Sequence, residues 1–128
     1  MTNPPLISVI DDNESVRESL QGFIRSLGFS ADVFASAEEF LHTENLRKTD
    51  CLILDVRMPG MSGLELQRQL LDSQVGIPVV FITSHEDEVA RMQALKDGAV
   101  DYLLKPFSEE ALLNAIHTAL GQRHALLT

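Results

Sequence analysis

Four charged positions each follow a short apolar run, and together they suggest a site. They are Asp11 and Asp12 after residues 7–10, Asp55 after residues 51–54, and Lys105 after residues 102–104. In an open α/β sheet, ligands bind in the crevice outside the carboxyl ends of the parallel strands, so we expect these charges to converge. Three carboxylates in one crevice repel one another and would retain at least one proton unless cations lie beside them. A hard divalent cation together with the Lys105 ammonium would remove that repulsion, so the pattern predicts a site for phosphoryl chemistry.

Asp55 is the candidate for the reacting group. A carboxylate at the end of the central strand can act as a nucleophile and form an aspartyl-phosphate. Mg²⁺ prefers oxygen ligands in octahedral geometry and keeps several waters, so two carboxylates and one carbonyl would be enough to hold it. Thr83 ends the apolar run 79–82 and would offer its hydroxyl to a phosphoryl oxygen. Lys105 would add a charge-assisted contact to the same group.

The segments that position these residues alternate between strand and helix patterns. Three nearly continuous apolar runs, at residues 6–10, 51–54 and 79–82, predict strands that a parallel sheet buries on both faces. Two runs interrupted by an aspartate, at residues 31–34 and 100–104, predict edge strands. Helical patterns lie at residues 16–27, 36–41, 64–71, 89–95 and 108–120. This alternation predicts an α/β fold with a parallel sheet and helices on both of its faces.

The helical patterns are not equally strong. Ser36 and Glu39 have the spacing of a capping box. The weakest apolar stripe consists of Val89, Met92 and Leu95, which indicates a helix that packs poorly against the sheet.

Length and charge exclude other classes of protein. The 128 residues correspond to one domain, for which we expect a core at about residues 6–120. Residues 121–128 are interpreted as a tail or as the start of a linker. Nineteen acidic and ten basic residues give a net charge of −9. Because a nucleic-acid-binding domain is usually basic, we expect no direct contact with nucleic acid.

Nothing in the sequence predicts a membrane segment or export. No apolar run approaches the roughly 20 residues that a membrane helix needs. The first five residues lack the charged region and long apolar stretch of a signal peptide. The single cysteine, Cys51, lies in an apolar run and predicts a buried thiol in a reducing compartment. We therefore expect a cytoplasmic protein.

The same positions carry a resemblance to a known family. The motifs at residues 11–12, 55–63, 83–84 and 102–107 look like those of the receiver domain of bacterial two-component response regulators, and the match runs from about residue 6 to residue 120. Residues 55–59 are similar to a nitrogen-fixation-regulator-like subfamily. The resemblance implies a flavodoxin-like, doubly wound sheet of five parallel strands in the order 2-1-3-4-5, with five helices. That order would place the two interrupted strands at the edges.

The resemblance also implies how the acidic residues work. Asp55 would accept a phosphoryl group from a sensor histidine kinase or a phosphotransfer protein. Mg²⁺, for which Mn²⁺ can substitute, would be held by Asp12, Asp55 and the backbone carbonyl of Arg57. Asp11 would act on the metal mainly through a water molecule.

Other roles follow from the same resemblance. Thr83 and Lys105 would bind the phosphoryl oxygens, and Tyr102 would be the switch aromatic that turns inward when Thr83 moves towards the phosphate. The peptide bond between Lys105 and Pro106 would be cis. His85, two residues after Thr83, would tune the lifetime of the phosphoryl group.

Arg57 would share this tuning role through its side chain. The modification would shift an equilibrium between inactive and active states and change a partner or homodimer surface built from residues 86–120. A DNA-binding output domain would be present if the chain is an isolated receiver from a longer protein, whereas a single-domain regulator would have none. The domain would assist its own phosphorylation and dephosphorylation without being an enzyme, and would act in signal transduction upstream of transcription control.

Three other functions compete with this interpretation. A Mg²⁺-dependent phosphatase with an aspartyl nucleophile would need a second aspartate two residues after Asp55, where this chain has Arg57. A flavin-binding module would need a loop that cradles phosphate, but residues 11–14 carry three carboxylates that would repel it. The third alternative is a degenerate receiver that works without phosphorylation, although all five functional positions are filled.

Overall fold

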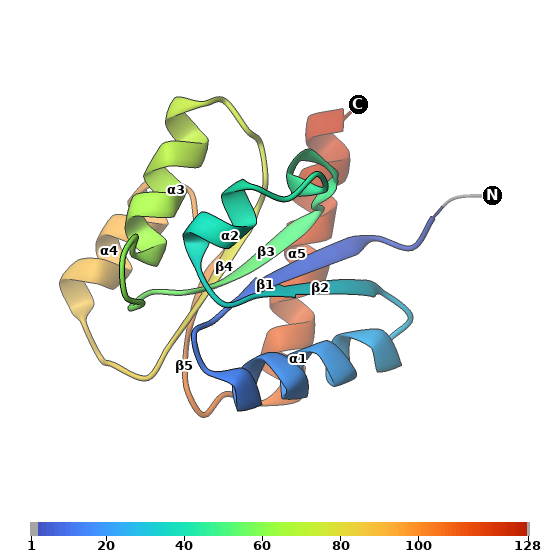
Figure 1. Cartoon of the computed structure of the whole chain (residues 1–128), viewed down its shortest axis with the longest axis horizontal. Coiled ribbons are helices and arrows are strands. Elements are labelled where there is room, and N and C mark those ends of the chain that lie inside the picture. The colour runs from blue at the N-terminus through green and yellow to red at the C-terminus, as the bar shows by residue number, and fades with distance from the viewer. Residues whose placement is uncertain (1–2, 128) are drawn as a thin grey trace.

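Five parallel strands form the central layer of the computed structural model, which describes residues 3–127 (Figure 1). The strands are β1 (Leu6–Ile10), β2 (Ser30–Phe34), β3 (Cys51–Asp55), β4 (Val79–Thr83) and β5 (Asp101–Leu104). Their order in the sheet is β2-β1-β3-β4-β5. The flavodoxin-like order is therefore confirmed, and the two interrupted runs are the edge strands.

Helices cover both faces of this sheet (Figure 1). They are α1 (Glu14–Ser26), α2 (Ala37–Leu41), α3 (Gly63–Asp72), α4 (Glu88–Lys96) and α5 (Glu109–Leu127), with a short 3-10 helix at Leu46–Lys48. The helices α1 and α5 pack on one face, and α2, α3 and α4 pack on the other. The prediction of five helices on a doubly wound sheet is confirmed.

The central strand shows why the buried runs are apolar throughout. Successive side chains of a strand point to opposite faces. Leu52 and Leu54 enter the core beneath α2, α3 and α4, whereas Cys51 and Ile53 enter the core beneath α1 and α5. The Cys51 thiol is buried as predicted, and this burial raises its pKa to about 12.

The helix starts agree only in part with the sequence signals. The Ser36 hydroxyl accepts a hydrogen bond from the Glu39 N–H (3.1 Å), but the Glu39 carboxylate accepts from the Ala35 N–H (3.2 Å). The predicted reciprocal bond is thus displaced by one residue. A complete capping box occurs instead at Ser62 and Glu65, at the start of α3.

Helix α4 packs through different residues from those that its sequence predicts. The side chains of Val89 and Met92 face solvent, with exposed fractions of 80% and 62%. Ala90 and Ala94 are the buried residues, and they share a core cluster with the rings of Phe81 and Tyr102. The prediction of a Val89–Met92–Leu95 stripe is therefore wrong at Val89 and Met92, while Leu95 is half-buried. Small alanine side chains face the core that holds the two rings instead.

Helix α5 is longer than predicted. It continues through Gly121 to Leu127, so residues 121–127 are helical, while Thr128 lies outside the described residues. Arg123 attaches this extension by donating to the carbonyl oxygens of Gly76 and Arg47, each at 2.7 Å. It also pairs with Asp50 at 3.6 Å. Whether the helix leads into a linker stays a prediction.

Within residues 3–127, no helix combines the length and the apolar character that crossing a bilayer requires.

Gly63 allows α3 to start directly against the end of β3. A Cβ atom built there would overlap the carbonyl oxygen of Asp55 and lie 3.1 Å from the Phe81 ring. We expect Gly63→Ala to lower the free energy of unfolding by about 1–3 kcal/mol, as overpacking does. The matched control is Gly22→Ala in α1, where a Cβ has no neighbour within 4 Å and alanine should stabilise the helix by up to about 1 kcal/mol.

Denaturant unfolding measures both changes: the free energy of unfolding should fall in Gly63→Ala and rise in Gly22→Ala. An unchanged unfolding midpoint for Gly63→Ala would show that the close approach of α3 to β3 is not a constraint on the fold.

Candidate functional site

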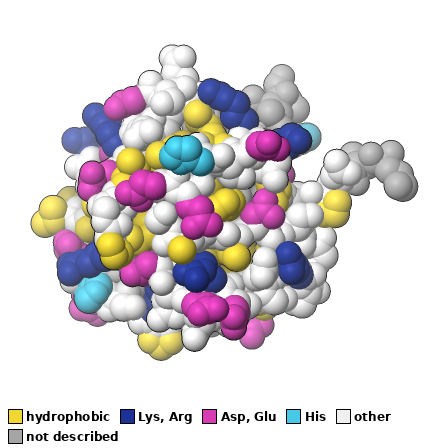
Figure 2. All heavy atoms as spheres, in the orientation of Figure 1, with side chains coloured by type: hydrophobic (Ala, Val, Ile, Leu, Met, Phe, Trp, Pro, Cys, Tyr) yellow, Lys and Arg dark blue, Asp and Glu magenta, His cyan; other side chains and the backbone are white. Residues whose placement is uncertain are grey.

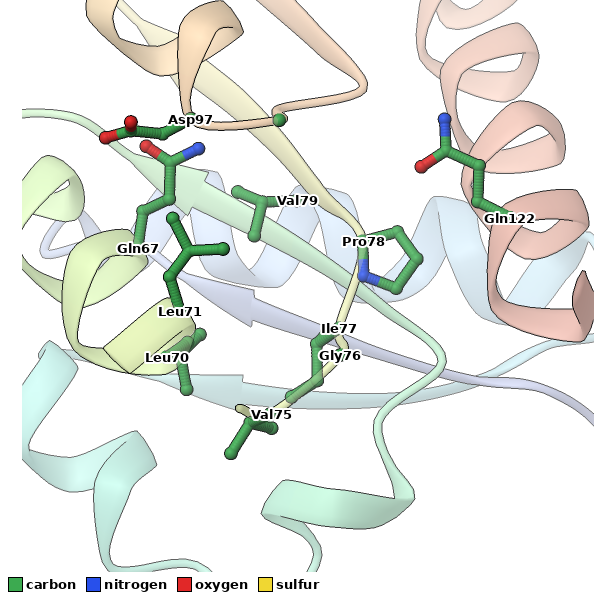
Figure 3. A pocket seen from close by; sticks show the side chains of 11 residues that line it. Gln67, Leu70, Leu71, Val75, Gly76, Ile77, Pro78, Val79, Asp97 and Gln122 are labelled. Atoms are coloured by element: carbon green, nitrogen blue, oxygen red, sulfur yellow. The ribbon is translucent and has the colours of Figure 1, made fainter. Parts of the chain in front are cut away.

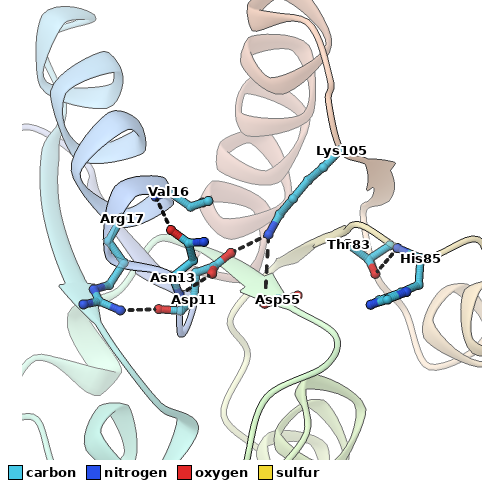
Figure 4. Close-up of polar contacts among 8 residues, drawn as sticks. All are labelled: Asp11, Asn13, Val16, Arg17, Asp55, Thr83, His85 and Lys105. Carbon is cyan, nitrogen blue, oxygen red and sulfur yellow. Dashed lines mark hydrogen bonds and ion pairs between the residues drawn. The ribbon is translucent and has the colours of Figure 1, made fainter.

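The predicted charges converge at the carboxyl edge of the sheet (Figure 4). The Lys105 ammonium donates to the Asp11 carboxylate at 2.7 Å and lies 4.0 Å from the Asp55 carboxylate. Asp11, Asp12 and Asp55 each offer a carboxylate oxygen, and these oxygens lie within 4.8 Å of one another. They come together because β1, β3 and β5 run parallel and end at the same edge.

The carboxylate, the N–H and the carbonyl of Asp11 all form hydrogen bonds. Its carboxylate accepts hydrogen bonds from the Asn13 N–H (2.8 Å) and from Lys105, and its own N–H donates to the Phe34 carbonyl (3.1 Å). Its carbonyl accepts from the Arg17 guanidinium at 2.8 Å. Asp11 is fully buried, whereas Asp12 is exposed. This difference suits an anchored Asp11 beside an Asp12 that can bind a cation directly.

Asp55 is a carboxylate in an unfavourable environment. Its pKa is raised from the ordinary 3.8 to about 6, mainly by burial and next by the neighbouring charge of Asp11. Lys105 and the Arg57 N–H act in the opposite direction, and the charge of Asp12 adds to the rise. The repulsion expected among three carboxylates is therefore present, and Lys105 offsets only part of it.

The donor set fits a hard metal ion. All three side chains of the acidic cluster offer carboxylate oxygens, which magnesium and calcium prefer, and no cysteine or histidine belongs to the cluster. Three carboxylates against one ammonium leave a surplus of negative charge that a divalent cation would neutralise.

Thr83 lies at the end of the next strand, on the other side of Asp55. Its side chain is buried, and its hydroxyl accepts from the His85 N–H at 3.1 Å (Figure 4). Its carbonyl accepts from the Lys105 N–H at 2.6 Å, which joins the ends of β4 and β5. The Lys105–Pro106 peptide bond is cis, as expected.

Tyr102 is half-buried, with its ring against the core. Its ring centroid lies 6.1 Å from that of Phe81, and its hydroxyl is buried without a hydrogen-bond partner among the described residues. Burial, followed by the charge of Asp87, raises its pKa. The switching role of Tyr102 stays a prediction.

Several residues of the site were not foreseen. Asn13 caps α1 by accepting from the Val16 N–H (3.2 Å), and asparagine before a helical pattern was an available signal. Glu38 accepts from the Met61 N–H (3.1 Å) and so supports the loop after β3. Arg17 and Glu38 each bind a residue outside their own helix, and no spacing pattern in the sequence predicts these contacts.

Fold and site together define a signalling receiver domain, and comparison with known proteins agrees. The family model described as "Response regulator receiver domain" matches residues 7–117. The chain belongs to this family.

Curated relatives support the same assignment. The response regulator protein TodT of Pseudomonas putida is 49% identical over 115 residues, which cover 90% of this chain and 51% of that protein. The transcriptional regulatory protein FixJ of Bradyrhizobium diazoefficiens is 38% identical over 122 residues, covering 95% of this chain and 60% of that protein. The chain thus spans about half the length of the curated relatives it matches.

A solved structure also tests the FixJ-like resemblance. The crystal structure of FixJ-N superposes with a TM-score of 0.84 at 36% identity, covering 94% of this chain and 96% of that one. The expected likeness to nitrogen-fixation regulators is confirmed.

The raised pKa of Asp55 predicts a pH-dependent gain of stability in Asp55→Asn. The folded protein holds the Asp55 proton more tightly than the unfolded chain does, so this group stabilises the fold most below about pH 4. That contribution is lost as the pH rises through about 6. One pKa unit corresponds to about 1.4 kcal/mol, and solvent at the crevice reduces it, so we expect Asp55→Asn to be more stable by about 1–2 kcal/mol at pH 7.

Metal-free denaturant unfolding at pH 7 and pH 4 checks this expectation, with the exposed Asp72→Asn as control. The gain should vanish at pH 4, and an equal gain at both values would contradict a raised pKa.

The acidic cluster predicts stabilisation by a divalent cation. A ligand that binds only the native state raises the melting temperature, so added Mg²⁺ should do so. Asp12→Ala should remove most of this rise, because it deletes the exposed carboxylate of the cluster. Glu14→Ala is the control, since Glu14 is an exposed carboxylate two residues away that lies outside the cluster. A full response to Mg²⁺ in Asp12→Ala would show that Asp12 is not a ligand.

Proposed function

We propose that Asp55 is the phosphoacceptor of a two-component receiver domain. The observation that carries this proposal is the place of its carboxylate, at the end of the central strand within reach of Asp11, Asp12 and Lys105. A sensor histidine kinase or a phosphotransfer protein is the phosphodonor. Asp55, Asp12 and the carbonyl of Arg57 hold Mg²⁺, with Asp11 acting through water and Mn²⁺ as a substitute.

The transfer needs an ionised Asp55. A carboxylate oxygen of Asp55 attacks the phosphorus of a phosphohistidine, the P–N bond breaks, and the freed imidazole takes a proton from solvent. With a pKa of about 6, Asp55 is mostly ionised at pH 7. When bound, Mg²⁺ neutralises charge on the phosphoryl oxygens.

Thr83 and Lys105 bind the transferred group. The Lys105 ammonium already lies 4.0 Å from Asp55, and a phosphoryl oxygen there offers it a charge-assisted hydrogen bond. The Thr83 hydroxyl now accepts from the His85 N–H and can donate its proton to another phosphoryl oxygen. Loss of the group by hydrolysis returns the domain to its starting state, and Arg57 and His85 set how fast water reaches it. The domain acts as a signalling switch rather than as an enzyme that turns over a substrate.

Phosphorylation changes the surface through which the domain contacts a partner. Val89 and Met92 on α4 and Leu104 on β5 are exposed apolar side chains of the 86–120 face. This face is the proposed site of a phosphorylation-dependent homodimer or partner contact, with Thr83 and Tyr102 as the switch. Relatives of this chain are named transcriptional regulatory proteins, which supports a role in the cytoplasm upstream of transcription control and a DNA-binding domain in a longer chain.

We do not expect the receiver itself to bind nucleic acid. Acidic and basic side chains are interspersed on the face shown in Figure 2, and the net charge of the chain is −9. A protein surface is therefore the expected contact.

A small phosphodonor with Mg²⁺ should add one phosphoryl group to the wild-type chain. Asp55→Asn should block the addition because the amide cannot form the acyl phosphate, while Asp72→Asn should be phosphorylated as wild type is. Intact-mass measurement separates these outcomes. Equal phosphorylation of wild type and Asp55→Asn would refute the assignment, and continued turnover of phosphomonoesters would indicate a phosphatase instead.

A further inference from the structure

The two ends of α4 are held in different ways. At the carboxyl end, the buried Gln67 of α3 donates to the Ala94 carbonyl at 3.0 Å, and Arg68 pairs with Asp97 at 3.5 Å. Gln67 is only 3% exposed and lies beside Asp97 at a cavity of about 170 Å³ (Figure 3). This end of the helix is therefore fixed to α3 by a buried hydrogen bond, and the ion pair adds a largely buried Asp97 bound to an exposed Arg68.

The amino end has a weaker attachment. Among the described residues, one ion pair links its first turn to another element: Arg57 to Asp87, at 3.5 Å. Asp87 also caps the helix, since its second carboxylate oxygen accepts from the Ala90 N–H at 3.0 Å. Arg57 is 55% exposed and Asp87 is 35% exposed, so this ion pair is readily exchanged for another partner.

The position of Arg57 connects this ion pair to the phosphoacceptor. Arg57 lies two residues after Asp55, in the loop that leaves β3. A phosphoryl group brings close to two negative charges and three acceptor oxygens. A guanidinium can bind such a group in a bidentate manner. Its present contact with Asp87 is long, at 3.5 Å, and carries only one negative charge.

We propose that Asp87 and phosphorylated Asp55 compete for the Arg57 guanidinium, so that phosphorylation releases the first turn of α4. The inference rests on the proposed function of Asp55. It assigns Asp87, which no motif of the site includes, as the positioning residue that holds Arg57 away from the acceptor in the unphosphorylated protein.

The charges on the released turn favour its movement. Glu86, Asp87 and Glu88 are consecutive acidic residues, and Arg91 pairs with Glu88 at 3.3 Å within the helix. Departure of Arg57 therefore leaves Glu86 and Asp87 without a neutralising positive charge. The first turn then moves while the carboxyl end stays attached to α3, so α4 pivots and opens the hollow of about 470 Å³ that the turn forms with Tyr102.

Asp87→Asn isolates the competition. Asparagine keeps the capping oxygen for Ala90 but removes the charge that attracts Arg57. With this competitor gone, beryllofluoride, a phosphoryl mimic, should bind in the presence of Mg²⁺ about two- to fivefold more tightly, as expected for loss of an exposed ion pair. Glu86→Gln is the matched control: it removes an equal charge one residue away and should change the affinity less.

A double-mutant cycle assigns the effect to Arg57. In an Arg57→Gln background, which keeps the backbone carbonyl, Asp87→Asn should leave the affinity for beryllofluoride unchanged. Equal affinities of wild type and Asp87→Asn would overturn the competition alone. Failure of both proteins to bind the mimic would overturn the acceptor role of Asp55 as well, so the two failures are distinguishable.

Amide exchange gives a readout that needs neither metal nor phosphate. In Asp87→Asn and in Arg57→Gln, residues 88–92 should exchange faster than in wild type, whereas residues 93–97 should be unchanged because Gln67 still holds them. Identical exchange of residues 88–92 in all three proteins would overturn the role of the ion pair in holding α4.

Discussion

Carboxylates brought within 4.8 Å of one another at the end of a sheet repel, and the arrangement around them follows from how that repulsion is offset. The Lys105 ammonium lies against Asp11 and near Asp55, but it is one charge against three. Two rigid supports keep the group together: the backbone bonds that fix Asp11, and the close approach of Gly63 behind Asp55. The fold thus stores unfavourable electrostatic energy that a cation and a phosphoryl group can relieve, and binding is favourable for that reason.

Features that depend on strand burial could be predicted from the sequence. The apolar runs gave the strands, and the aspartates that interrupt two of them marked the sheet edges, because an edge strand tolerates a half-buried charge. Convergence of Asp55 with Lys105 followed as well, since parallel strands end at one edge. The family resemblance added the strand order and the cis bond before Pro106, which periodicity alone does not determine.

Features that depend on contacts between distant side chains could not be predicted. Two residues of the stripe on α4 were assigned wrongly because packing against the core, and not the helix's own composition, decides which face is buried. Helix α5 continues through Gly121, a residue that usually ends helices, because Arg123 binds segments far away in the sequence. The ion pair of Arg57 with Asp87 joins exposed charges 30 residues apart, and such pairs leave no periodic signal.

Cys51 gives the molecule an internal reporter. It is the single thiol of the chain, it lies on the central strand with neighbours on both sides, and burial raises its pKa to about 12. A thiol reagent at neutral pH can reach it only when α1 and α5 separate from the sheet or the sheet itself opens, so its labelling rate measures opening of the core rather than fraying at the surface. The same inertness leaves the native surface free of competing thiols, and a cysteine introduced on α4 could carry a spectroscopic label on an otherwise unmodified protein.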